Sequence, residues 1–370
     1  MAVPLLDLKA QHATIHDEVV AAMMRVVDDQ AFILGPPVGQ LEEAVAELSN
    51  TKFAIGCASG TDALLLAMKA LDIGPGDEVI TTPFTFFATA GTIHNVGAKP
   101  VFADIDPDNF NLLPQAAASA VTSRTKAVMP VDLFGQMAAL DAIATAIPDQ
   151  PIIEDAAQSI GATREIGGRT MRAGEFPTIG TFSFFPSKNL GGYGDGGMMV
   201  TQDEAIANRL RRLRVHGGLK TYFHDEVGFN SRLDSLQAAV LLAKLPHLEK
   251  WSAARRRNAA YYNAAFADMD EVRIPSVDPQ NVSIYNQYTI RAKRRDDLQL
   301  HLKEKGIGNS IYYPLPLHLQ PCFEYLKYRE GECPESERAA KEVISLPIYP
   351  ELTEGQLDEV AGAVREFYGH

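Results

Sequence analysis

The stretch FSFFPSKNLGGYGDGG, residues 182–197, is the most informative part of this chain. A single lysine, Lys188, follows a strand-like aromatic run and leads into a segment with five glycines between Gly191 and Gly197. An amine among apolar neighbours has its charge suppressed and can act as a Schiff-base nucleophile. Glycines also let the backbone approach a bulky group closely. The stretch therefore indicates either a reactive lysine or a buried, paired lysine beside a tight loop.

A second segment, PIIEDAAQS at residues 151–159, reads as a short apolar strand that ends in a carboxylate. In open parallel sheets, ligands bind beyond the carboxyl ends of the strands, so Asp155 occupies a position where chemistry is often found. A carboxylate there can pair with a protonated pyridine nitrogen and keep the ring an electron sink. The alternative is that Asp155 is only the N-cap of a following helix, which is a common use of aspartate.

A third segment, ASGTDALLLAM at residues 58–68, has a turn of small residues between a predicted strand and an amphipathic helix. The backbone N–H groups of Gly60 and Thr61, the Ser59 and Thr61 hydroxyl groups and the helix dipole suit a phosphate. An ordinary capped helix explains the same residues. Together, the lysine, the acid-tipped strand and the phosphate turn are the parts of a pyridoxal phosphate site.

These motifs and three others resemble the DegT/DnrJ/EryC1/StrS family of sugar aminotransferases, which are pyridoxal phosphate enzymes of fold type I. The resemblance runs from about Leu5 to the C-terminus, in the family's order. The matching segments are SGTDAL (59–64), PFTFFAT (83–89), EDAAQS (154–159), SFFPSKNLG (183–191), GFNSRLD (228–234) and PLPLHLQP (314–321). The resemblance implies a homodimeric enzyme that uses pyridoxal 5'-phosphate to move an amino group from L-glutamate to the keto sugar of a nucleotide sugar.

The resemblance assigns roles to the residues around the cofactor ring. It implies that Lys188 forms the Schiff base and then carries protons between the substrate carbon and the cofactor. It implies that Asp155 pairs with the pyridine nitrogen and that Gln158 binds the phenolic oxygen. Phe86 would stack on the ring, whereas the sequence alone favours a core aromatic. Family members with histidine in place of the lysine catalyse dehydration, so Lys188 indicates amino transfer.

The resemblance also implies how the cofactor phosphate is held. Ser59, Gly60 and Thr61 are expected at the phosphate from the turn. Ser183 is expected there from the strand before the lysine. Asn230 is expected to reach the phosphate from the other subunit, so that each active site is shared in a homodimer.

Further residues are candidates for binding the substrate. A bidentate guanidinium such as that of Arg232 suits a carboxylate or a phosphate, and the alternative is a surface salt bridge. The family's sugar pocket borders the loop at residues 314–321, which adds Tyr312, Tyr313 and His318 as candidates. The nine histidines show no paired ligand spacing, so we predict no metal site.

Composition and charge narrow the class of protein. The chain has 370 residues and a net charge of −13, from 34 basic and 47 acidic residues. Its apolar content of 46% and charged content of 22% are typical of a soluble globular protein. Three scattered cysteines and no secretory signal predict a cytoplasmic protein. Arginine clusters at 209–214 and 255–257 favour solvated helix faces over a nucleic-acid surface, and no run is apolar enough to span a membrane.

Strand-like and helix-like segments alternate through the first two thirds of the chain, which predicts an α/β fold with a mostly parallel sheet flanked by helices. We predict a large cofactor-binding domain over residues 1–250, with an N-terminal helical segment, and a smaller C-terminal α+β domain over residues 251–370. The expected strands are 52–57, 78–82, 99–103, 126–131, 151–154, 285–292 and 307–312. The expected helices are 61–71, 114–121, 137–146, 234–268 with a break at Pro246, 296–305, 336–344 and 353–366.

Several other functions fit parts of the sequence. A sugar dehydratase is disfavoured by Lys188, and a cysteine desulfurase would need a nucleophile loop around Cys322 or Cys333. An amino-acid aminotransferase and a non-catalytic regulatory member of the family are the remaining alternatives. For the leading function, the resemblance leans toward the branch of the family that acts at C3, in which the motif NSRLD at residues 230–234 also occurs. It implies a 3-keto, UDP- or dTDP-linked hexose or hexuronate as the substrate, and the choice between C3 and C4 stays open at this point. The aminated product would serve cell-surface polysaccharide or secondary-metabolite biosynthesis.

Overall fold

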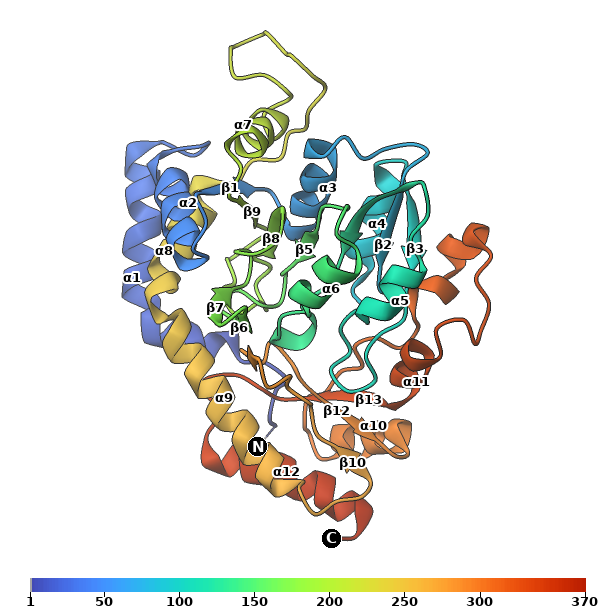
Figure 1. Cartoon of the computed structure of the whole chain (residues 1–370). Coiled ribbons are helices and arrows are strands. Elements are labelled where there is room, and N and C mark those ends of the chain that lie inside the picture. Colours follow the sequence, from blue (N-terminus) through green and yellow to red (C-terminus); the bar gives the residue numbers. More distant parts are fainter. Residues whose placement is uncertain (1) are drawn as a thin grey trace.

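The computed structural model describes residues 2–370, so that Met1, the first residue of the predicted large domain, lies outside it. A central sheet of seven strands occupies its middle (Figure 1). The strands are β1 (Phe53–Cys57), β2 (Glu78–Thr81), β3 (Lys99–Phe102), β4 (Thr125–Met129), β5 (Ile153–Asp155), β8 (Ile179–Ser183) and β9 (Gly197–Thr201).

The order of the strands is β1-β9-β8-β5 followed by β4-β2-β3. The two parts are joined by parallel bridges from Val128 to Ile152 and from Val131 to Asp155. Strand β9 runs antiparallel to both of its neighbours, whereas β2 is parallel to β3 and β4, and β5 is parallel to β8. The prediction of a mostly parallel sheet is confirmed.

Helices cover both faces of this sheet because neighbouring residues of its strands point to opposite sides. Ile55, Val79 and Ala127 pack under α3 (Gly60–Ala70), α4 (Phe87–Asn95) and α7 (Glu204–Leu213). Ala54, Ile80 and Val128 pack on the other side. The helices there are α2 (Pro36–Leu48), α5 (Pro114–Ser119), α6 (Leu140–Ala146) and α8 (Ser235–Lys244), and α8 also contacts α1 (Leu8–Asp29).

The C-terminal part of the chain has its own sheet and its own apolar cluster. The sheet order is β10-β12-β13, with β10 (Val272–Arg273), β12 (Tyr288–Ala292) and β13 (Val343–Leu346) all antiparallel. The surrounding helices are α9 (Leu248–Ala265), α10 (Arg295–Glu304), α11 (Pro334–Glu342) and α12 (Glu354–Tyr368). In Figure 1, α9, α10 and α12 lie below the central sheet. The domain boundary near residue 250 stays a prediction.

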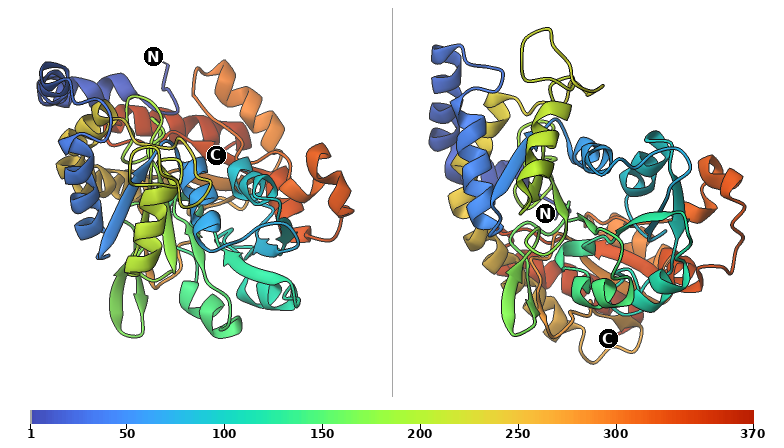
Figure 2. Two further views of the ribbon diagram at one scale, coloured as in Figure 1. Left: turned by 90° about the horizontal axis from the view of Figure 1, so that it is seen from above. Right: turned by 45° about the horizontal axis from the view of Figure 1, so that its top comes forward.

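The remaining elements are short. A hairpin of β6 (Thr163–Ile166) and β7 (Arg169–Arg172) turns at Gly167 and Gly168, both at positive φ, and pairs with β11 (Asn281–Val282). Single 3-10 turns are η1 (Leu133–Gly135), η2 (Leu245–His247), η3 (Leu317–Leu319) and η4 (Pro321–Leu326). The loop between α7 and α8 stands away from the body of the molecule in Figure 1 and in the right view of Figure 2.

Two sequence predictions in the C-terminal part are wrong. Residues 307–312 form no strand, but only isolated bridges from Ile307 to Val3 and from Ser310 to Ser345. Pro314 and Pro316 follow closely and lack the N–H groups that a longer ladder would need. The helix expected over 336–344 ends at Glu342, because the β-branched Val343 and Ile344 pair with β12.

Candidate active site

Lys188 follows the end of β8 in a turn of the glycine-rich segment, and it is partly buried. Burial lowers the pKa of its amine to about 8, and the charge of Asp155 opposes this shift. Within residues 2–370, its Nζ makes no hydrogen bond and no ion pair. The alternative of a paired structural lysine therefore does not fit. Lys188 is an amine that is partly neutral near physiological pH and open to reaction.

Asp155 is the last residue of β5, and only 5% of it is exposed. Its Oδ2 accepts a hydrogen bond from Thr89 Oγ1 at 2.8 Å, and its Oδ1 accepts one from the Ala157 N–H at 3.3 Å. Burial raises the pKa of the carboxyl group, and these donors and Lys188 oppose the shift. In the described part of the chain, β5 is followed by a turn and then β6 with no helix between them, so the capping alternative is wrong.

Gln158 and Tyr313 are brought together from distant parts of the chain. Gln158 Oε1 accepts the Phe134 N–H at 2.7 Å, and its Nε2 donates to the Tyr313 hydroxyl oxygen at 3.3 Å. Burial raises the pKa of the Tyr313 hydroxyl. The amide is thus held between a backbone donor and a neutral phenol.

The predicted phosphate turn lies where the start of α3 meets the end of β8. Ser59 is the N-cap of α3, and its Oγ accepts the Asp62 N–H at 3.0 Å. A Cβ added to Gly60 would lie 2.6 Å from the Ser183 Cβ, so α3 begins in direct contact with the end of β8. Thr61 is exposed in the first turn of the helix. Backbone N–H groups, hydroxyl groups and a helix N-terminus therefore converge at one place.

Phe86 is 58% exposed and lies just before α4, so it is not a core aromatic. Its ring centroid is 6.5 Å from that of Tyr313. Tyr312 is half-buried and packs against the apolar cluster that contains Phe84 and Phe134. An exposed ring therefore faces the same region as the Gln158–Tyr313 pair.

The segment at residues 228–234 is tied to the start of α3. Ser231 Oγ donates to Asp62 Oδ2 at 2.8 Å, and Asn230 beside it is exposed. Arg232 is half-buried and makes no hydrogen bond or ion pair within residues 2–370. The salt-bridge alternative for Arg232 therefore does not fit. Its guanidinium donors have no partner among the described residues.

The structure places His318 away from this group. The side chain is fully buried, and its Nε2 bonds Glu337 Oε1 at 3.0 Å. The ring packs against Phe102 and Tyr328. A ring without exposed surface cannot contact a solvated sugar, so the expectation that His318 binds substrate is wrong for this conformation.

Sequence reasoning missed some residues of the site. Thr89, which bonds Asp155, lies in the PFTFFAT motif and could have been found there. Phe134 and Asp132 carry no comparable signal, because they lie outside the matching segments and their contacts join segments more than 20 residues apart in the chain. Within residues 2–370, no cluster of histidine, cysteine and acidic residues is placed to hold a metal ion. No helix in the same range is long and apolar enough to cross a membrane.

Comparison with known proteins gives consistent matches over the whole chain. Residues 13–365 match the profile of the DegT/DnrJ/EryC1/StrS aminotransferase family. A pleiotropic regulatory protein of Geobacillus stearothermophilus is 50% identical, with 100% of both chains covered. The UDP-N-acetyl-3-dehydro-alpha-D-glucosamine 3-aminotransferase of Acidithiobacillus ferrooxidans is 44% identical over 98% of this chain and 97% of its own. The crystal structure of S. venezuelae DesV with a ketimine intermediate has a TM-score of 0.97 and 40% identity, and covers 100% of this chain and 99% of its own.

Proposed function

Because this chain belongs to the DegT/DnrJ/EryC1/StrS aminotransferase family, we propose that it moves an amino group from L-glutamate to the keto sugar of a nucleotide sugar, with pyridoxal 5'-phosphate as cofactor. The observation that carries the proposal is the unpaired Lys188 amine, with a pKa of about 8, beside the buried Asp155 carboxylate. The sugar is a 3-keto, UDP- or dTDP-linked hexose or hexuronate. The 44% identity to an enzyme named for 3-amination of a UDP sugar supports position 3.

The residues at the start of α3 fit the phosphate of this cofactor. Gly60 has no room for a side chain, and its backbone can therefore lie directly against a ligand. Ser59, Thr61 and Ser183 supply hydroxyl groups next to the N-terminus of an 11-residue helix. A doubly charged phosphate is favoured there by the donors and by the helix dipole.

The residues around Asp155 fit the ring. A pyridinium nitrogen would give the buried carboxylate the cationic partner that offsets its desolvation. Gln158 Nε2, whose direction is fixed by the Phe134 N–H, would donate to the ring hydroxyl oxygen. The exposed face of Phe86 would cover the ring from one side. When bound, the cofactor supplies an electron-withdrawing ring that stabilises negative charge at the carbon next to the transferred nitrogen.

Lys188 would hold the cofactor covalently and then move the proton at the reacting carbon. An amine with a pKa of about 8 can take up a proton and return it near neutral pH, since catalysis by a base is most efficient when its pKa lies near the working pH. The nearby Asp155 charge keeps the pKa from falling further. A lysine at this position supports amino transfer over the dehydration that a histidine would indicate.

Arg232, Tyr312 and Tyr313 would bind the substrates. The unpaired Arg232 guanidinium can make two parallel hydrogen bonds to the carboxylate of glutamate or to a phosphate of the nucleotide. The Tyr312 and Tyr313 rings line the same side of the site as Phe86 and offer polar hydroxyl groups to a sugar. His318 does not belong to this set because it is buried.

The active unit is a cytoplasmic homodimer in which each site takes residues from both chains. Asn230, an exposed residue of the loop between α7 and α8, would reach the phosphate of the partner subunit. Large apolar side chains are exposed on this loop and near Asp234, which bridges to Ile33. They are Leu219, Tyr222, Phe223, Val227, Phe32, Ile33 and Leu34. Large apolar side chains that are exposed in this number favour burial against another chain.

A second candidate function is regulation without catalysis, favoured by the name of the 50% identical relative from Geobacillus stearothermophilus. That function would place no demand on an unpaired lysine beside a buried carboxylate. The two candidates differ in what happens when glutamate is added. Only the enzyme converts bound cofactor to its amino form and passes nitrogen to a sugar.

Absorbance spectroscopy and mass spectrometry test the proposal. The purified protein with pyridoxal phosphate is expected to be yellow and to bleach with L-glutamate. A UDP-linked 3-keto N-acetylglucosamine should then gain an amino group and restore the colour, whereas Lys188→Ala should do none of this. A wild-type protein that binds the cofactor but never bleaches, with any amino donor, would support the regulatory candidate instead.

A further inference from the structure

The orientation of Gln158 depends on one backbone group. Because the Phe134 N–H can only donate, it holds the amide oxygen of Gln158. The Nε2 group is thereby left on the side of Tyr313, to whose hydroxyl oxygen it donates at 3.3 Å. The inference below rests on the proposed function, in which Gln158 Nε2 binds the ring oxygen of the cofactor.

Phe134 has a backbone conformation that bulky residues rarely adopt. Its φ of 59° and ψ of 10° lie in the left-handed region. Such residues persist where the surroundings over-determine them, and they gather at functional sites. The following Gly135 has a φ of +104°, and a Cβ on it would lie 2.6 Å from the Asn286 nitrogen. The backbone at Gly135 therefore packs directly against the backbone of residues 285 and 286.

Hydrogen bonds fix the two ends of this loop. The Leu133 N–H donates to Asn111 Oδ1 at 2.9 Å, and Asn111 Nδ2 donates to the Gln136 carbonyl oxygen at 3.3 Å. The Gly135 carbonyl oxygen accepts the Ile284 N–H at 2.9 Å and the Ser283 Oγ at 3.1 Å. These bonds hold Phe134 from both sides.

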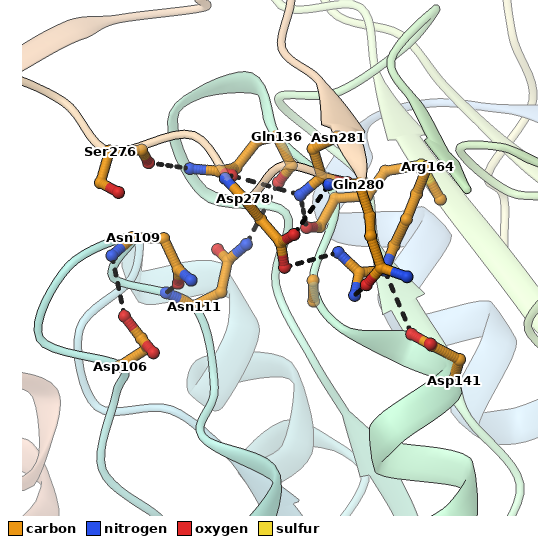
Figure 3. Close-up of polar contacts among 12 residues, drawn as sticks. Asp106, Asn109, Asn111, Gln136, Asp141, Arg164, Ser276, Asp278, Gln280 and Asn281 are labelled. Carbon is orange, nitrogen blue, oxygen red and sulfur yellow. Dashed lines mark hydrogen bonds and ion pairs between the residues drawn. The ribbon is translucent and has the colours of Figure 1, made fainter. Parts of the chain in front are cut away.

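The side chain of Gln136 connects the loop to residues 276–281, as Figure 3 shows. Its Nε2 donates to the Ser276 carbonyl oxygen at 2.8 Å. Its Oε1 accepts the Asp278 N–H at 3.1 Å and Asn281 Nδ2 at 3.2 Å. Only 7% of Gln136 is exposed, so water does not readily replace these three partners.

Residues 276–281 are themselves anchored by Arg164 of β6. Its NH1 donates to Asp278 Oδ2 at 2.9 Å, its NH2 to Gln280 Oε1 at 2.7 Å and its Nε to Asp141 Oδ1 at 3.1 Å (Figure 3). Arg164 is buried, and its three donor groups are all bonded. Gln136 is therefore tied to a rigid support and not to a free loop.

We propose that Gln136 is a positioning residue for the cofactor site. Its side-chain amide ties the loop of residues 133–136, called the Phe134 loop below, to residues 276–281. This tie fixes the position and direction of the Phe134 N–H, which in turn orients Gln158. Gln136 touches neither cofactor nor substrate in this proposal. Its effect passes through Phe134 to the donor that faces the ring oxygen.

The first test needs no cofactor. Amide hydrogen exchange at Phe134 is measured in the cofactor-free protein for wild type, Gln136→Met and the control Gln280→Met. Gln280 belongs to the same anchored segment and contacts Arg164, but makes no bond to the Phe134 loop. We expect exchange about tenfold faster or more in Gln136→Met, and wild-type exchange in the control, because local opening follows the loss of local bonds. Equal exchange in all three proteins overturns the proposal.

The second test uses the pH midpoint of the absorbance of bound pyridoxal phosphate. A donor at the ring oxygen favours its negative charge, so loss of that donor should move the midpoint upward. Gln136→Met is expected to shift the midpoint in the same direction as Gln158→Leu, and to add nothing in the double variant. If Gln136→Met shifts the pH midpoint equally in the wild-type protein and in Gln158→Leu, the proposal is overturned, because the effect then does not pass through Gln158.

A milder variant protects the test from a failure to fold. Asn281→Ala removes one of the three bonds to the Gln136 amide at a half-buried position, and should produce a smaller shift of the same sign. If neither Asn281→Ala nor Gln136→Met changes the hydrogen exchange at Phe134 or the pH midpoint of the bound cofactor, the proposal is contradicted. If wild type binds no pyridoxal phosphate, the proposed function fails, while the exchange test still decides the link from Gln136 to Phe134.

Discussion

Glu154 and Asp155 are adjacent in β5 and point to opposite faces of the sheet, where they meet different surroundings. Asp155 faces Thr89 and the Lys188 amine. Glu154 is completely buried, and its Oε2 accepts the Gly174 N–H at 2.7 Å. Burial and the charge of the nearby buried Asp132 carboxyl group both raise the pKa of Glu154 well above its ordinary value and favour its protonated form. The end of β5 thus carries two carboxyl groups in different surroundings: Asp155 beside the Lys188 amine, and Glu154 in the buried interior on the other face.

Glu154→Gln should stabilise the protein above pH 4.5. Burial and the Asp132 charge raise the pKa of Glu154 well above its ordinary value of 4.5. The unfolded chain releases this proton near pH 4.5 and the folded chain does not, so stability falls as the pH rises from 4.5 to the folded pKa. Glutamine has the same shape, can accept the Gly174 N–H through its amide oxygen, and has no acidic proton to lose. The melting temperature of Glu154→Gln should therefore exceed that of wild type at pH 8, and the difference should shrink by pH 4. The exposed Glu43→Gln control should show no such trend.

Asp155→Asn should have opposite effects on activity and on the stability of the cofactor-free protein. A neutral amide cannot keep a pyridine nitrogen protonated, so amino transfer should fall at least about 100-fold. Burial raises the pKa of Asp155, and the cofactor-free fold therefore loses stability as the pH rises above 3.8. The variant should melt no lower than wild type at pH 7. Near-normal turnover would show that Asp155 has only a structural role.

Lys188→Ala should remove amino transfer and the yellow colour while the fold persists. Proton transfer by a positioned base contributes about 10²–10⁴-fold, and the covalent link to the cofactor is lost as well. Urea unfolding should give a free energy no lower than wild type, because a partly desolvated amine has been removed. The exposed Lys303→Ala in α10 is the matched control and should keep full activity. Retained turnover in Lys188→Ala would falsify the assignment.

The sequence predicted the parts of this site that are local in the chain. Asp155 ends a strand, and Lys188 and the turn at Gly60 each follow one. An apolar strand with a polar residue at or after its end can be recognised from a few residues. The burial of His318 was not readable, because it depends on Glu337 from a helix 19 residues later. Strand β9 was not predicted at all, and its antiparallel direction could not be read from the sequence, because an apolar run looks the same in either direction. The conformation of Phe134 depends on its bond to Gln158 and on the contact of the next residue with Ile284. No pattern within a few residues of Phe134 predicts these contacts.

Gly60→Ala should weaken cofactor binding, since the added Cβ would lie 2.6 Å from the Ser183 Cβ and push the start of α3 from the end of β8. We expect the dissociation constant of pyridoxal phosphate to rise about tenfold or more, equivalent to ~1.4 kcal/mol, in a fluorescence titration. Gly362→Ala is the matched control in α12, where a Cβ meets nothing within 4 Å. It should leave binding unchanged and stabilise the fold by up to about 1 kcal/mol. Unchanged binding in Gly60→Ala would exclude this turn as the phosphate site.

Two chains should share each active site through Asn230. This residue is exposed in the loop between α7 and α8, and Ser231 ties the end of that loop to α3. If Asn230 reaches the partner's phosphate, Asn230→Asp should be inactive, because a carboxylate repels that phosphate. Co-expression with Lys188→Ala should then restore activity. In a mixed dimer one site has both wild-type residues and the other has both defects, so random pairing should recover about a quarter of wild-type activity per chain.

Two controls make this test decisive. Asn208→Asp places the same charge on exposed α7 and should remain active on its own. Co-expression of Lys188→Ala with Asp155→Asn should recover nothing, because both residues belong to the same chain's site and every mixed dimer carries a defect in each site. Recovery with Asn230→Asp but not with Asp155→Asn therefore identifies Asn230 as the residue supplied across the interface. An inactive Asn230→Asp that is not rescued, or an active monomer by sedimentation, contradicts the shared site, because a complete site within one chain would need no exchange of residues.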